Sequence, residues 1–253
     1  FERHPKGMKP NAIGIALCRR ADALLAELDL AETEIAAVIS GHSGTVRIGA
    51  VTGAAVGYSV PAIQELKRNA PNVEVQIVVA PSVQLMNSLM EGDLDFILSR
   101  VPPGIDSRRL KILHGRVESL SFLVRDDHPL TSQTNILLQD LATLPWIMQT
   151  QGMPIRSGVE AAYIEVGLDL PSDIVESASL LVTLAYLTSS NAVSPVAKEV
   201  ANLLTRSELG GVRELNMRKA IILSPYHLIR PGERQLSPVA ERLLELVHEK
   251  ISI

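Results

Sequence analysis

From residue 45 onward, short runs rich in β-branched residues alternate with segments of helical periodicity. The first series reads strand, helix, strand, helix, strand, at residues 45–51, 58–69, 73–79, 83–90 and 94–98. This alternation is typical of a parallel β-sheet with helices on its faces. Crossovers of this type are right-handed in nearly all proteins, so the carboxyl ends of the strands share one edge of the sheet.

A second, similar series follows from residue 120. It alternates strands and helices at residues 120–124, 145–149, 157–166, 173–176, 179–187 and 192–193. Two strand-like runs and a terminal helix complete the pattern, at residues 220–223, 227–229 and 237–249. Two similar halves with two connecting strands predict a bilobal α/β sensor, whose cleft lies at the carboxyl ends of the strands.

Residues 11–40 carry an apolar seam with coiled-coil spacing. Asn11 can cap a helix here, and the glycine-rich link 41–44 ends it. The seam residues alternate in steps of four and three: Leu17, Ala21, Leu24, Leu28, Ala31, Ile35 and Val38. A helix that packs this stripe on its own domain is the alternative. Because the helix is long and precedes a complete new domain, we favour a dimerising helix.

Charge is unevenly distributed along the chain. The 253 residues have a formal net charge of −4, but residues 1–20 contain five Lys or Arg and one Glu, which gives +4 there and −8 elsewhere. A basic end on an acidic body is compatible with contact with nucleic acid, since Lys and Arg displace counterions from phosphates. An ordinary solvated terminus is the alternative, and charge alone favours it.

The composition is that of a globular protein. The chain is 46% apolar but has no run of 18 apolar residues, so we expect no membrane-spanning helix. Its first residues lack the apolar stretch of an export signal. The single cysteine, Cys18, cannot form an internal disulfide, which fits the reducing cytoplasm.

Motifs for catalysis are missing. The six histidines lack metal-ligand spacing, and no Gly-x-Ser-x-Gly occurs. Gly49, Gly53 and Gly57 do not form a dinucleotide-binding motif; we expect them to let the backbone pass closely at a pocket. Asp126-Asp127-His128 precedes Pro129 and reads as a solvated turn. We therefore expect no enzyme activity, no metal and no cofactor.

The order and spacing of several segments resemble LysR-type transcriptional regulators over the whole chain. The start, Phe-Glu-Arg-His-Pro-Lys-Gly-Met, resembles the end of the family's winged helix-turn-helix domain. The other matching segments lie in and after its effector-binding domain: residues 44–49, Pro61, Ala70-Pro71, residues 91–95, Asp127-His128-Pro129-Leu130, residues 226–232 and Leu236-Ser237-Pro238. The polar segment 188–195 departs from the family's Gly-x-Gly pattern.

The resemblance implies a two-lobed effector domain of the periplasmic-binding-protein type II fold, preceded by a long dimerisation helix. The predicted domains are a remnant of the DNA-binding domain, the linker helix with its hinge, and the effector domain, at residues 1–10, 11–43 and 44–253. Lobe I would comprise residues 44–120 and 228–253, and lobe II residues 121–227. Because the recognition helix lies outside this sequence, we expect no sequence-specific DNA binding by these residues alone.

The resemblance also places an effector between the lobes. Carried over by position, the contact residues are Thr52, Gly53, Ser82, Val83, Ser99 and Arg100 from lobe I, and Gln149, Thr150, Ser177 and Ser179 from lobe II. Hydroxyls and N–H groups at helix N-termini favour an anion, and an arginine matches a carboxylate. We therefore expect a small carboxylate. Helix capping by Thr52 and Ser82, and a structural ion pair at Arg100, are the alternatives.

The function implied is that of a cytoplasmic, ligand-responsive transcriptional regulator. Its partners would be promoter DNA, the effector, further copies of the chain in a homodimer or homotetramer, and RNA polymerase, but no membrane. Arg3, His4 and Lys6 would contact the DNA backbone. The alternative is a solute-binding protein of a transport system, which shares the two-lobed plan but needs export or a lipid anchor and no dimerising helix.

Overall fold

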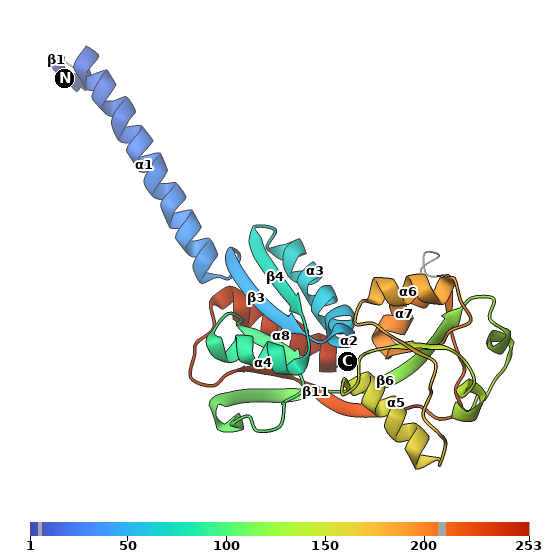
Figure 1. Ribbon diagram of the computed structural model, residues 1–253. Helices are drawn as coiled ribbons and strands as arrows, with labels where there is room; N and C mark the ends of the chain where they lie inside the picture. Colours follow the sequence, from blue (N-terminus) through green and yellow to red (C-terminus); the bar gives the residue numbers. More distant parts are fainter. Residues whose placement is uncertain (5–6, 207–210, 253) are drawn as a thin grey trace.

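The computed structural model describes residues 1–4, 7–206 and 211–252. It consists of a two-lobed body and a long helix that projects away from it (Figure 1). We call the lobe next to the long helix lobe I and the other lobe II. Two strands, β6 (Leu110–Arg125) and β11 (Ile222–Pro231), link the lobes, so the bilobal α/β prediction is confirmed.

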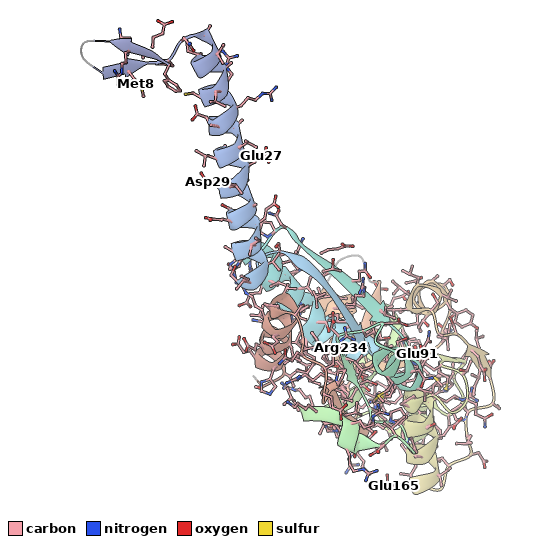
Figure 2. The ribbon with its side chains drawn as sticks, turned by 90° about the vertical axis from the view of Figure 1, so that its left-hand side faces the viewer. Met8, Glu27, Asp29, Glu91, Glu165 and Arg234 are labelled. Carbon is pink, nitrogen blue, oxygen red and sulfur yellow. The ribbon has the colours of Figure 1, made fainter. Side chains whose placement is uncertain are left out.

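The long helix α1 (Ala12–Ile39) begins where the capping pattern predicts, because the Asn11 side chain accepts a 2.9 Å hydrogen bond from the Gly14 N–H. Its far end carries a hairpin of β1 (Glu2–His4) and β2 (Gly7–Lys9), and Met8 in the middle of β2 is labelled in Figure 2. At the near end Gly41, with a φ of +69°, turns the chain against Pro238.

The sheet of lobe I has the order β6-β11-β5-β3-β4. Its central strands β3 (Gly44–Ala50), β4 (Val73–Val79) and β5 (Phe96–Ser99) are parallel, and β11 runs antiparallel to β5 and β6. Successive residues of a strand face opposite sides, and both sides are covered. Helices α3 (Val60–Asn69) and α8 (Pro238–Ser252) bury one face, and α4 (Ser82–Glu91) buries the other.

In lobe II the strands lie in the order β8-β7-β9-β6-β10; β7 and β8 form a two-stranded sheet of their own, which an isolated bridge from Trp146 to Val193 joins to the rest. The strands of lobe II besides β6 are β7 (Trp146–Met148), β8 (Ile174–Glu176), β9 (Ser194–Ala197) and β10 (Val212–Glu214). Helix α5 (Pro154–Glu165) covers the face that contains Trp146. Helices α6 (Leu180–Thr188) and α7 (Lys198–Arg206) cover the other face. Three short 3₁₀ turns complete the described chain: η2 (Ser107–Arg109), η3 (Pro129–Ser132) and η4 (Leu138–Leu141).

Several elements differ from the sequence prediction. Strand β6 begins at Leu110 rather than residue 120, because polar residues and a glycine interrupt the apolar runs between Lys111 and Ser119. The two runs predicted at 220–223 and 227–229 are one strand with shifts of register around Tyr226. The short strand predicted at 192–193 lies just before β9, which begins at Ser194, and α7 and β10 were not predicted.

The first helix of lobe I also begins earlier than its predicted start at residue 58. Helix α2 (Thr52–Ala54) continues through a π-helical turn, η1 (Ala55–Ser59), into α3 without a break. Its two glycines weakened the helical signal in the sequence. Among the described residues, no helix is both long and apolar enough to cross a membrane.

Candidate functional site

The polar residues predicted for lobe I meet at the carboxyl edge of its sheet. Thr52 follows β3 and opens α2, Ser82 opens α4 after β4, and Ser99 ends β5. The N–H of Arg100 donates a 3.3 Å hydrogen bond to Oγ of Ser82, and Oγ of Ser99 donates to the Arg100 carbonyl at 3.0 Å. Val83 lies beside them with an exposed side chain. These residues therefore do form one cluster.

The Arg100 side chain is engaged inside the protein. Its Nη2 pairs with the Glu118 carboxylate, and its Nε donates to the carbonyl and Oγ of Ser224 at 3.1 Å and 3.3 Å. Glu118 is only 3% exposed, so its charge depends on this partner. The structural ion pair considered for Arg100 is thus present. An effector carboxylate would share the guanidinium with Glu118.

The lobes touch where α7 of lobe II approaches α2 and the π-helical turn η1 of lobe I. A Cβ added at Gly53 would lie 2.6 Å from Glu118 Oε1, and one added at Gly57 would lie 2.6 Å from Glu199 Cγ. The two glycines are four residues apart and share one helix face. Their missing side chains therefore allow Glu199 of lobe II to approach the helix backbone.

A tyrosine pair surrounds this contact. Oη of Tyr58 donates a 3.1 Å hydrogen bond to Glu199 Oε1, and the rings of Tyr58 and Tyr226 lie 6.1 Å apart. Burial raises the pKa of both phenols, so both are protonated hydrogen-bond donors at neutral pH. Among the described residues, neither the buried Oε2 of Glu199 nor the Tyr226 hydroxyl has a hydrogen-bond partner.

The residues predicted for lobe II form a second cluster. Gln149 and Thr150 follow β7, and Ser177 follows β8. The N–H of Ser177 donates a 2.9 Å hydrogen bond to the Met148 carbonyl. Ser179 caps α6 by accepting from the Val182 N–H at 3.4 Å. The buried Oε1 of Gln149 has no hydrogen-bond partner in the part of the chain that is described. That oxygen could accept a bond from a ligand.

The two predicted clusters remain separate. No hydrogen bond or ion pair within residues 1–4, 7–206 and 211–252 connects the lobe I cluster to the lobe II cluster. Sequence reasoning missed the residues at the actual lobe contact, Tyr58, Glu118, Glu199 and Tyr226. The spacing of Gly53 and Gly57 was the available signal.

His128 corrects one expectation. It is 3% exposed rather than solvated, and its Nδ1 accepts a 3.2 Å hydrogen bond from the Leu130 N–H. Burial lowers the pKa of His128, with a smaller contribution from nearby Arg125. The neutral ring therefore serves as a buried cap for η3, while Asp126 and Asp127 are exposed.

The apolar seam of α1 is open to solvent. Leu24 is 67% exposed and Leu28 62% exposed, and the rest of the seam is exposed as well. Figure 2 shows the helix standing clear of the body, with Glu27 and Asp29 midway along it. The seam therefore does not pack on its own domain. Arg3 is exposed in β1, whereas Lys6 and the side chain of His4 lie outside the described part.

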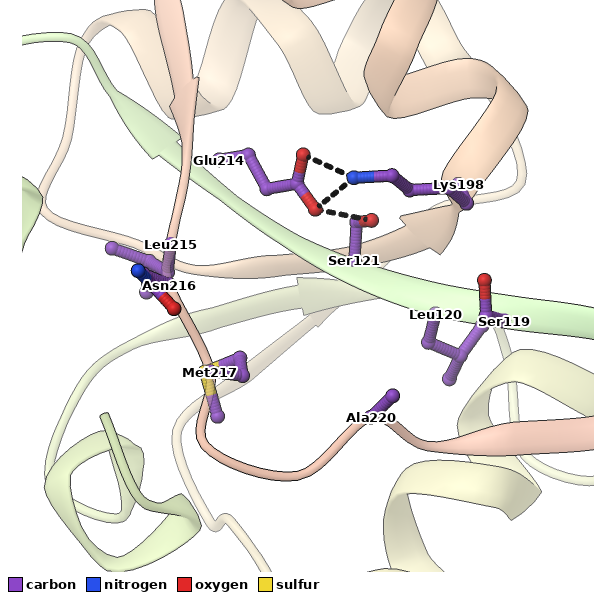
Figure 3. A pocket seen from close by; sticks show the side chains of 9 residues that line it. All are labelled: Ser119, Leu120, Ser121, Lys198, Glu214, Leu215, Asn216, Met217 and Ala220. Carbon is purple, nitrogen blue, oxygen red and sulfur yellow. Dashed lines mark hydrogen bonds and ion pairs between the residues drawn. The ribbon is translucent and has the colours of Figure 1, made fainter. Parts of the chain in front are cut away.

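A cavity of about 410 Å³ opens on lobe II (Figure 3). It is lined by Ser119, Leu120, Ser121, Lys198, Glu214, Leu215, Asn216, Met217 and Ala220. None of the ten residues predicted to contact an effector lines it.

Comparison with known proteins identifies the family. Residues 40–252 match the family model described as LysR substrate binding domain. The HTH-type transcriptional regulator GbpR of Azospirillum brasilense is 33% identical over 245 residues, covering 96% of this chain and 71% of the relative. GbpR of Rhizobium radiobacter is 33% identical over 190 residues, covering 75% of this chain and 63% of the relative. A crystal structure of CbnR, a LysR family transcriptional regulator, has a TM-score of 0.77 at 19% identity and covers 97% of this chain and 83% of that one.

These relatives are transcriptional regulators, and the alternative of a transport solute-binding protein finds no support among them. This chain spans roughly two thirds of the length of the two GbpR regulators, 71% of one and 63% of the other. The structural likeness to CbnR agrees with the two-lobed fold behind a projecting helix. The chain therefore belongs to the LysR family of transcriptional regulators, and residues 40–252 are its substrate-binding domain.

Proposed function

We propose that this chain is the effector-sensing and self-associating part of a ligand-responsive, DNA-binding transcriptional regulator that acts in the cytoplasm and catalyses no reaction. The observation that carries the proposal is the open apolar seam of α1 joined to a body of two lobes. An exposed seam of this spacing is stable when a second helix covers it. The polar edges of the two lobes offer the effector a site.

The N-terminal hairpin lies at the far end of α1, where a DNA-binding domain would be attached. Pairing two α1 helices would hold two such domains side by side, which is the arrangement that reads two half-sites of DNA. Arg3, together with His4 and Lys6, would contact phosphates there. Regulation then requires an effector that binds two arrangements of the lobes with different affinity.

The effector is a small carboxylate. Thr52 and Ser82 lie at the first residues of α2 and α4, where the N–H groups of a helix favour a negative charge. Among the described residues, Nη1 of Arg100 forms no hydrogen bond, so one edge of the guanidinium remains for a ligand. The unpaired Oε1 of Gln149 would accept a bond from a hydroxyl or amine of the same molecule.

Thermal-shift screening of small carboxylic acids tests this site, because a ligand that binds only the folded state raises its melting temperature. We expect at least one acid to stabilise the wild type and the exposed-pair control Arg108→Ala. The same acid should not stabilise the double variant Arg100→Ala/Glu118→Gln, which removes the buried charge along with its partner. A panel without any stabilising acid, or full stabilisation of the double variant, would contradict the proposal.

A further inference from the structure

The cavity on lobe II exists because two strands separate along one edge of β6. The N–H of Leu120 donates to the Ile221 carbonyl at 2.9 Å, and the Phe122 carbonyl accepts from the Leu215 N–H at 2.9 Å. Residues two apart in a strand present their backbone groups to the same edge. Strand β10 therefore leaves this edge after Glu214, and β11 joins it at Ile222. The chain between them arches outward and leaves Ser121 at the floor of the opening (Figure 3).

The rim of the cavity is held in place. The N–H of Ile136 donates to the Asn216 carbonyl at 2.9 Å, and the Arg218 N–H donates back to the Ile136 carbonyl at 2.9 Å. These two bonds fix the arching segment to a different part of lobe II. A ligand site whose walls are already ordered spends less entropy on binding.

The cavity lies apart from the proposed effector site. Ser177 and Gln149 follow β8 and β7, whereas the cavity is lined by residues of β6, by Lys198 at the start of α7 and by the chain from Glu214 to Ala220. None of the residues predicted to contact an effector lines it. The cavity is therefore a second site, and an occupant would touch β6 where that strand passes from one lobe to the other.

The charges in the cavity cancel. Nζ of Lys198 donates to both carboxylate oxygens of Glu214, at 2.7 Å and 2.8 Å, and Oγ of Ser121 donates to Glu214 Oε1 at 2.7 Å. Figure 3 shows these three side chains pointing toward one another. An anion would have to displace Glu214 from the lysine, and a cation would have to displace Lys198 from the carboxylate.

A hydroxyl group avoids this competition, because it both donates and accepts hydrogen bonds. It can donate to Oε2 of Glu214 and accept from the third N–H of Lys198 without breaking the ion pair. The Ser119 hydroxyl and the Asn216 amide line the same cavity, and so do apolar side chains that suit C–H groups: Leu120, Leu215, Met217 and Ala220. The volume of about 410 Å³ is within the range of small-molecule sites, roughly 300–1,000 Å³. We propose that this cavity binds a small uncharged polyhydroxylated molecule, a sugar or polyol.

Saturation-transfer NMR and calorimetric titration of the whole chain test this site. The probes are D-glucose, D-galactose, D-xylose, L-arabinose, D-mannitol and myo-inositol, with D-glucuronate and D-galacturonate as charged counterparts. We expect at least one neutral probe to bind, and its affinity to fall tenfold or more in Asn216→Ala and in Glu214→Gln. The matched control is Glu165→Gln, the same change in an exposed ion pair with Lys219 elsewhere on lobe II.

Ser119→Leu is the second variant, because it fills the cavity without altering the Lys198–Glu214 pair; it keeps the test decisive if Glu214→Gln does not fold. The sugar site is overturned if no neutral probe binds, if the uronates bind more tightly, or if binding survives both Asn216→Ala and Ser119→Leu. Binding of the neutral probe should persist in Arg100→Ala/Glu118→Gln. Failure of the carboxylate site and failure of the sugar site are therefore separate results.

Discussion

The hydroxyl of Tyr58 in lobe I donates a 3.1 Å hydrogen bond to Oε1 of Glu199 in lobe II. It directly joins side chains of the two lobes, next to Gly57, whose missing side chain lets Glu199 approach. The tyrosine lies in the π-helical turn η1, and such turns are frequent at functional sites. We infer that any change in the angle between the lobes must first rearrange this contact.

Tyr58→Phe should lower the free energy of unfolding by about 1–3 kcal/mol, because the change leaves Oε1 of the half-buried Glu199 without its donor. Urea denaturation measures the loss. Tyr186→Phe is the control, because the Tyr186 hydroxyl forms no hydrogen bond in the described part of the chain. Equal stability of Tyr58→Phe and Tyr186→Phe would show that the Tyr58–Glu199 bond contributes nothing.

Gly57→Ala should push the lobes apart. Its new Cβ would lie 2.6 Å from Glu199 Cγ and 3.2 Å from Glu199 Cβ, which are too close for ordinary contact. We expect a lower melting temperature and a larger radius of gyration in small-angle X-ray scattering. Adding Glu199→Ala should reverse both effects in part by removing the atoms that clash. If the double variant is no more compact than Gly57→Ala, the clash is not with Glu199.

Arg100→Ala should destabilise the protein by about 3–5 kcal/mol, since it leaves the buried Glu118 carboxylate unpaired. Arg108→Ala breaks an exposed ion pair with Asp106, which water screens, so its effect on stability should be far smaller. Chemical denaturation of both variants measures the difference. The double variant Arg100→Ala/Glu118→Gln should recover much of the stability that Arg100→Ala loses. If Arg100→Ala and Arg108→Ala lose similar amounts of stability, Arg100 has no structural role.

Stability should fall as the pH drops below about 6.5, the ordinary pKa of histidine. The pKa of His128 is lowered in the folded state, so between the two values the unfolded chain binds more protons and acid favours unfolding. The contribution is fully present above pH 6.5. NMR titration of the ring measures the folded pKa, and His128→Asn, which keeps an acceptor for the Leu130 N–H, should flatten the stability profile. A folded pKa at or above 6.5 would contradict this.

The sequence predicted elements best where a single periodicity dominates. Helix α1 and strand β3 are elements that the spacing of apolar residues alone predicts. Because β3, β4 and β5 are parallel, the residues after them meet at one edge, where Arg100 bonds to Ser82. The first ten residues of β6 and the whole of helix α7 were not predicted, because their structure depends on partners far along the chain. A glutamate in a strand is expected at the surface, yet Glu118 is buried, because Gly53 of α2 packs against it.

The position of ligand sites was harder to predict for the same reason. Residues after strands can be assigned to one edge of a sheet from their order, but whether two edges approach one another depends on how the lobes are joined. The cavity beside Lys198 and Glu214 results from two strands leaving one edge of β6, and no local pattern encodes that separation.

Self-association through α1 is the central claim, and light scattering after size-exclusion chromatography at micromolar concentration tests it most directly. The wild type should have two or four times the mass of one chain. Leu24→Glu/Leu28→Glu places charges in the seam and should reduce the measured mass toward that of one chain. Leu30→Glu alters a similarly exposed leucine outside the seam and should leave the mass unchanged. A monomeric wild type, or an assembly unaffected by the double variant, would contradict the account.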